Sequence, residues 1–111
     1  MEIKCEVMRL KKSKIKDYIN MHLNPWPEIM EEIKNSEIIE EYVFIIKNIV
    51  IVIIKANDVI NALKILRKKK ECKKWSKIVK DMISLDNTKL PKLNILNAKC
   101  IFSFRKEVSK K

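Results

Sequence analysis

The side chains best suited to chemistry lie close together near the start of the chain. The single histidine, His22, follows Tyr18 by four residues and precedes Trp26 by four. Because positions four apart on an α-helix lie over one another, Tyr18 and His22 are expected to share one face. An imidazole with an ordinary pKa of about 6.5 can give or take a proton at neutral pH. His22 is therefore the first candidate for acid–base catalysis.

Aromatic side chains around this histidine could bind a small carbohydrate. A phenol and an indole donate hydrogen bonds and present flat ring faces to C–H groups. Trp26 and the second tryptophan, Trp75, could both provide such a face. Structural roles are the alternatives: His22 could pack at a helix end beside a proline break, and Trp26 could be held between two prolines. Glu28 is interpreted as a partner of a helix dipole, not as a catalytic acid.

The composition excludes several other chemistries. The chain has no glycine, so neither a Gly-rich phosphate loop nor a dinucleotide-binding fingerprint can be present. Three cysteines without a Cys-x-x-Cys spacing, and one histidine, do not predict a metal site. An odd cysteine count fits a reducing compartment better than a disulfide framework. We therefore expect a cytoplasmic protein without a structural zinc ion.

The elements that position these residues follow from the spacing of apolar side chains. Residues 2–10 alternate as a strand, and Ser13 is expected to cap the helix that follows. The helical period runs through His22 and is interrupted before Pro27, because residues that precede proline avoid the α conformation. A second helix is expected from Pro27 to about Asn35.

Two strands are expected next, over residues 38–46 and 49–55. The Lys47-Asn48 connection predicts a two-residue hairpin turn in which Asn48 takes a positive φ. The run Ile49–Ile54 is apolar at every position. Such a run predicts a strand that is buried on both faces.

Two helices and a last strand are expected in the remainder of the chain. Their expected bounds are a helix capped by Asn57 or Asp58 and reaching Lys70, a helix over about 71–84, a connection over 86–97 and a strand over 98–104. We expect one domain over residues 1–111, with an ordered core over about 2–105 and a basic tail over 106–111.

The order of elements predicts an α+β fold with the ferredoxin-like split β-α-β-β-α-β arrangement. Its four-stranded antiparallel sheet would carry helices on one face only. The second face would then expose apolar residues of the strand Ile49–Ile54, and exposed apolar patches mark interfaces. A second copy packed sheet to sheet would cover this face, so we expect a symmetric homodimer.

Several segments resemble the L-rhamnose mutarotase family, in register from about residue 3 to 104 with one deletion at the hairpin. These segments are Val7-Met8, Tyr18-x-x-x-His22, Trp26-Pro27-Glu28, Glu41-Tyr42 and Cys72-Lys73-Lys74-Trp75. The resemblance implies a dimeric α/β barrel that interconverts the α and β anomers of a free 6-deoxy sugar, without metal or organic cofactor. It further implies that His22 is the proton donor and that Tyr18, Tyr42 and Trp75 lie around the sugar.

The chain also departs from the family pattern. Ser76 stands where the family has the second of two adjacent tryptophans, and Leu23 shifts the family's Asn-Pro pair by one position. A family glycine before the second strand is absent. Loss of an aromatic platform weakens stacking on a sugar, so another deoxy sugar or a loss of activity stays an alternative.

Anomer exchange fits the residue types. The ring oxygen must gain a proton and the anomeric hydroxyl must lose one, so that the ring opens and closes again on its other face. A positioned acid–base pair accelerates such a step by about 10²–10⁴-fold. His22 is the first member of the pair, whereas Tyr18, a carboxylate or a bound water could be the second.

Two other classes of function remain alternatives. The net charge of +11 and the basic residues 67–70 could serve a non-enzymatic module that binds nucleic acid through phosphates. The same dimeric sheet could also form a small monooxygenase that acts on an organic or haem substrate. The N-terminal segment does not read as a signal peptide, and the run Ile49–Ile54 is too short to span a membrane.

Overall fold

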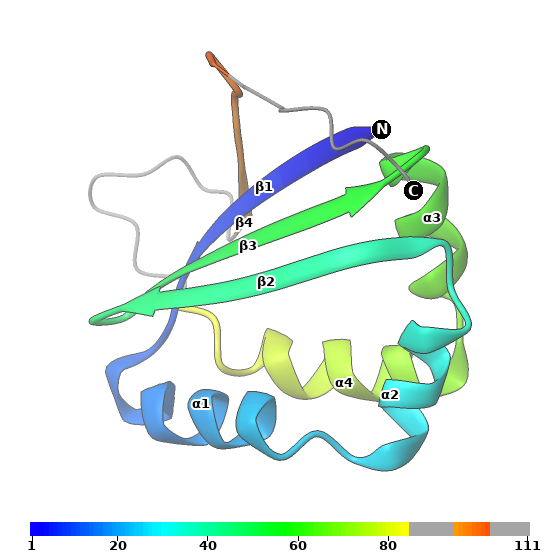
Figure 1. Ribbon diagram of the computed structural model, residues 1–111. Coiled ribbons are helices and arrows are strands. Elements are labelled where there is room, and N and C mark those ends of the chain that lie inside the picture. Colours follow the sequence, from blue (N-terminus) through cyan, green and yellow to red (C-terminus); the bar gives the residue numbers. More distant parts are fainter. Residues whose placement is uncertain (85–94, 103–111) are drawn as a thin grey trace, which may run out of the picture.

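The computed structural model describes residues 1–84 and 95–102 (Figure 1). In these ranges the chain forms four strands, one short 3-10 helix and four α-helices. Their bounds are β1 Glu2–Arg9, the 3-10 helix Lys12–Lys14, α1 Ile15–Leu23, α2 Pro27–Lys34, β2 Ile38–Ile46, β3 Ile49–Ala56, α3 Val59–Leu66, α4 Lys70–Lys80 and β4 Ile95–Ala98. None of these helices is long and apolar enough to cross a membrane.

The strands form one sheet in the order β2-β3-β1-β4, and every neighbouring pair is antiparallel. The predicted α+β fold with a split β-α-β-β-α-β arrangement is therefore confirmed. Figure 1 shows the helices on one side of this sheet. No helix of residues 1–84 and 95–102 covers the other face of the sheet.

The core lies between the sheet and the helices. In β3 buried residues alternate with half-buried ones: Val50, Val52 and Ile54 face the helices. They pack with Met8, Tyr18 and residues of α3 in one apolar cluster. The expectation that both faces of β3 are buried is wrong for the single chain, because helices cover only one face of an antiparallel sheet.

Two local predictions at turns need correction. Ser13 does not cap α1; it lies within the 3-10 helix, and Lys14 precedes α1 without a side-chain cap. In the hairpin, Lys47 and not Asn48 has the positive φ, of 55°. Asn48 instead binds Leu10, the residue that follows β1: its carbonyl accepts from Leu10 N–H at 2.8 Å, and its Nδ2 donates to the Leu10 carbonyl at 3.0 Å. These two contacts hold Asn48 in its observed conformation.

The break between α1 and α2 is the predicted one. Helix α1 ends at Leu23, and Pro27 occupies the first turn of α2. The cap of α3 is also confirmed, since the Asp58 carboxylate accepts from Asn61 N–H at 3.1 Å. Helix α3 ends at Leu66, before the predicted Lys70, because Lys69 is extended and is the N-cap of α4.

The last strand begins earlier than expected. Strand β4 covers Ile95–Ala98 and pairs with Cys5–Met8 at the edge of the sheet. Residues 99–102 are described but form no strand. Most of the connection predicted over 86–97 lies outside the described residues. The end of the strand predicted over 98–104 and the basic tail over 106–111 also lie outside them.

Candidate active site

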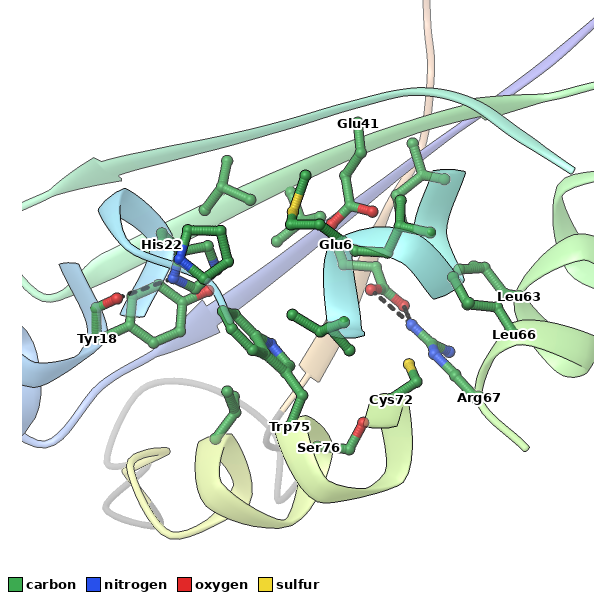
Figure 2. A pocket seen from close by; sticks show the side chains of 18 of the residues that line it. Glu6, Tyr18, His22, Glu41, Leu63, Leu66, Arg67, Cys72, Trp75 and Ser76 are labelled. Atoms are coloured by element: carbon green, nitrogen blue, oxygen red, sulfur yellow. Dashed lines mark hydrogen bonds and ion pairs between the residues drawn. The ribbon is translucent and has the colours of Figure 1, made fainter. Parts of the chain in front are cut away.

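A cavity of about 220 Å³ lies between the sheet and the helix layer. It is lined by side chains from β1, β2, β3 and all four α-helices, and most of its wall is apolar. Its polar and aromatic residues are Glu6, Tyr18, His22, Glu41, Arg67, Cys72, Trp75 and Ser76 (Figure 2). Sites for drug-sized ligands measure roughly 300–1,000 Å³. This smaller cavity suits a compact ligand such as one sugar ring.

His22 projects into the cavity from the last turn of α1, where it is half-buried. Its Nδ1 lies 2.8 Å from the carbonyl oxygen of Tyr18. A carbonyl can only accept, so Nδ1 carries the hydrogen and Nε2 is left as the basic nitrogen. Burial lowers the pKa of His22 below its ordinary value, and the bond to the Tyr18 carbonyl opposes that shift. At neutral pH this imidazole is neutral, so in the resting site His22 is a base and not the proton donor that the family resemblance implies.

Tyr18 lies beside His22, as the four-residue spacing predicts, with ring centroids 4.2 Å apart. Only 3% of Tyr18 is exposed. Burial raises the pKa of its phenol far above the ordinary value, and the negative charge of Glu41 raises it further. The phenol therefore keeps its proton and can act as a hydrogen-bond donor, but not as a base near neutral pH.

The two tryptophans have different positions. Trp75 lines the cavity and presents its ring to His22 in an edge contact, with centroids 5.0 Å apart. Trp26 is absent from the cavity wall and packs behind Trp75, with centroids 5.3 Å apart. Its Nε1 donates to Glu71 Oε1 at 3.0 Å, which ties the α1–α2 break to α4. Trp26 thus supports the wall and does not form it.

Tyr42 does not reach this cavity. Successive side chains of a strand point to opposite faces, so Glu41 and Val43 line the cavity while Tyr42 and Phe44 lie on the open face. Tyr42 is 49% exposed and stacks on Phe44 with centroids 6.5 Å apart. This position corrects the expectation that Tyr42 lies around the ligand with His22.

The fold and this arrangement can be compared with known proteins. The family model for L-rhamnose mutarotase matches residues 4–104 of the chain. The chain belongs to the L-rhamnose mutarotase family. The predicted family and class of enzyme, an isomerase acting on carbohydrate, are therefore confirmed. No curated protein matches the chain.

Two solved structures resemble the chain in fold. The crystal structure of an L-rhamnose mutarotase from Formosa agariphila has a TM-score of 0.64 and 20% identity, covering 96% of this chain and 100% of that one. The tetracenomycin F2 cyclase of Streptomyces glaucescens, a type-II polyketide cyclase, has a TM-score of 0.61 and 12% identity, with the same coverages. Identities this low show a shared fold.

The site also contains charged residues that the sequence analysis did not identify as site residues. Glu6 is 5% exposed, and its carboxylate binds Arg67 Nη2 at 3.1 and 3.3 Å and Lys4 Nζ at 3.3 Å. Glu41 faces the same cavity from β2. The available signal was the strand alternation, because Glu6 and Met8 share the face of β1 that packs on the helices.

Burial and these charges shift the pKa values of two cavity side chains, Glu41 and Cys72. Loss of solvation raises the pKa of Glu41, the Glu6 carboxylate raises it further, and Arg67 acts in the opposite direction. Burial, followed by the charge of Glu32, raises the pKa of the Cys72 thiol, which disfavours a nucleophilic thiolate there. In residues 1–84 and 95–102, no three His, Cys, Asp or Glu side chains gather as metal ligands.

Helix α4 brings Trp75, Cys72 and Ser76 to the wall because α2 holds its first turn. The Glu32 carboxylate accepts from the backbone N–H groups of Glu71 and Cys72, both at 2.8 Å. Ser76, which the family resemblance places where a second tryptophan would stand, also lines the cavity. Its small side chain leaves Trp75 as the tryptophan of this wall.

Proposed function

We propose that this protein interconverts the α and β anomers of a free 6-deoxy sugar such as L-rhamnose. Membership of the L-rhamnose mutarotase family supports this function. The observation that carries it in the site is His22, with Nδ1 bound to a backbone carbonyl and Nε2 left as a base in a cavity for one sugar ring. No described cluster of side chains suggests a metal, and we propose none.

The proposed reaction conserves all atoms and electrons. His22 Nε2 takes the proton of the anomeric hydroxyl as the C1–O5 bond breaks, and a second acidic group of the site, a side chain or a bound water, gives a proton to the ring oxygen. Rotation about C1–C2 turns the other face of the aldehyde toward the O5 hydroxyl. Ring closure then reverses both proton transfers and restores the protein. A positioned acid–base pair contributes about 10²–10⁴-fold to such a step.

Other cavity residues would bind the sugar. The Tyr18 phenol keeps its proton and would donate to a sugar oxygen. The face of Trp75 would pack on the C–H side of the ring, as aromatic rings do with apolar surfaces. Trp26 would act through Trp75, which it supports from behind.

We also propose a homodimer that forms through the open face of the sheet. This face carries large apolar side chains that helices do not cover, with Phe44 55% and Ile46 62% exposed. Exposed apolar patches of this kind mark interfaces. A second copy offers the same face, as a two-fold interface requires. Tyr42 would then be an interface residue.

The alternatives have less support. Family membership favours an isomerase over a basic module for nucleic acid. The charged groups Glu6, Glu41 and Arg67 in the otherwise apolar cavity wall also favour a polar ligand over the organic or haem substrate of a small monooxygenase. The cytoplasmic location stays a prediction, consistent with three free cysteines, Cys5, Cys72 and Cys100.

The test is anomer exchange measured by saturation-transfer NMR on L-rhamnose and L-fucose. Wild-type protein should accelerate exchange of the anomeric resonances, and His22→Ala should lower the added rate by about 100-fold or more. Asn20→Ala is the control, because Asn20 is an exposed residue of the same helix. Equal rates for wild type and His22→Ala, or no acceleration of either sugar, would reject the function.

A further inference from the structure

The two carboxyl groups of the cavity have different partners. Glu6 is held by Arg67 and Lys4, so its charge is compensated on two sides. Glu41 makes no hydrogen bond or ion pair with any residue in the described ranges. Glu41 can therefore give or take a proton without breaking a contact of the protein, whereas protonation of Glu6 would weaken two ion pairs.

Glu41 is also positioned to face a ligand. It lies on the helix-facing side of β2, opposite Ile54 of β3. Figure 2 shows its carboxyl group pointing into the cavity from the sheet, while His22 enters from α1. A ring bound in the cavity would therefore lie between an acid on the sheet and an imidazole on the helix layer.

The surroundings of these two groups favour different protonation states. Glu41 as a whole residue is exposed, but loss of solvation at its carboxyl group and the charge of Glu6 raise its pKa, whereas burial lowers the pKa of His22. Opposite shifts in a pair of titratable groups are the pattern by which active sites assign an acid and a base. Tyr18 is unsuited to the second role because it keeps its proton.

We propose that Glu41 is the second acid–base residue of the mutarotase reaction, acting on the ring oxygen while His22 acts on the anomeric hydroxyl. This inference rests on the proposed function. The Glu41 carboxylic acid gives its proton to O5 as the C1–O5 bond breaks, and His22 Nε2 takes the hydroxyl proton. On closure the Glu41 carboxylate takes back the O5 proton, and the His22 imidazolium returns its proton to the carbonyl oxygen.

The pH dependence follows from the groups that face Glu41. These groups are Glu6 on β1, Tyr18 and His22 on α1, Arg67 after α3 and Cys72 on α4; Lys4 on β1 is paired with Glu6. The active form has Glu41 protonated and His22 neutral. The wild-type rate should therefore fall at low pH as His22 gains a proton, and at high pH as Glu41 loses one.

The decisive variant is Glu41→Gln, which keeps the size and hydrogen-bonding groups of the side chain but cannot transfer the proton. We expect the added exchange rate to fall by about 100-fold, with binding of L-rhamnose within about threefold of wild type by NMR titration. Glu41→Asp retains a carboxylic acid and should keep most of the rate. The matched control is Glu40→Gln, the same change one residue earlier, where Glu40 binds Lys55 at 3.5 Å.

A pH profile separates proton transfer from a merely structural role. Glu41→Gln should lose the fall at high pH and retain the fall at low pH, whereas Glu40→Gln and Glu41→Asp should keep both. The inference is overturned if Glu41→Gln matches wild type in rate while His22→Ala is inactive, or if its high-pH fall persists. If wild type itself does not accelerate exchange, the proposed function has failed instead.

Discussion

The strongest prediction on stability concerns the contact between Glu32 and the start of α4. The N-cap residue of α4 is Lys69, and its side chain makes no hydrogen bond to the first turn of the helix. The Glu32 carboxylate of α2 instead accepts the N–H groups of Glu71 and Cys72 at 2.8 Å each. It thereby satisfies two of the donors that every helix N-terminus leaves without a partner. The negative charge also complements the helix dipole.

The magnitude follows from these two bonds. A hydrogen bond to a charged acceptor is worth about 1.5–3 kcal/mol, and loss of a helix cap costs about 0.5–2 kcal/mol. The freed N–H groups can be partly rehydrated, because Glu71 and Cys72 are only half-buried. We therefore expect Glu32→Ala to lower the free energy of unfolding by about 2 kcal/mol. That corresponds to a fall of roughly 8–15 °C in Tm for a small domain.

The assay is urea unfolding followed by tryptophan fluorescence, since both tryptophans of the chain lie against α4 or on it. The control is Glu31→Ala, the neighbouring residue of α2, whose carboxylate accepts an exposed hydrogen bond of 3.4 Å from Asn35 Nδ2. Glu31→Ala should stay within about 0.5 kcal/mol of wild type, as surface substitutions usually do. If the two variants unfold at the same urea concentration, the cap does not stabilise α4 as argued.

Two further predictions concern association and pH. In sedimentation velocity, Phe44→Lys should be monomeric at concentrations where the wild type is dimeric. The control Ile60→Lys changes a 73% exposed position of α3 and should stay dimeric. A monomeric wild type would contradict the proposed interface. The free energy of unfolding should fall as pH drops below about 6.5, because unfolded His22 binds a proton that the folded site resists. His22→Gln should remove that fall, and an unchanged pH profile would contradict it.

The sequence predicted the elements well where its local signals agreed. Alternation identified β1, and the spacing of Tyr18 and His22 correctly predicted their shared helix face. The break before Pro27 and the Asp58 cap also matched, because proline geometry and capping act within a few residues. Ser13 failed as a cap because a 3-10 helix precedes α1.

The side of β2 on which a residue lies was harder to predict. Glu40 and Glu41 are both charged, and the five residues that follow are all apolar, so this strand has no polar alternation. A register shift between Ile38 and Glu40 adds a further irregularity. A change of one position moves a side chain to the other face of the sheet. Glu41 therefore lines the cavity while Tyr42 lies outside it.

The sequence by itself determined the strand and helix order, the proline break and the pairing of His22 with Tyr18, because each depends on neighbours along one element. The tertiary structure decided that Glu6, Glu41 and Arg67 meet in one cavity, and that Glu32 supports α4. Those contacts join residues far apart in the chain, and their positions depend on sheet register and helix packing, which no local pattern encodes.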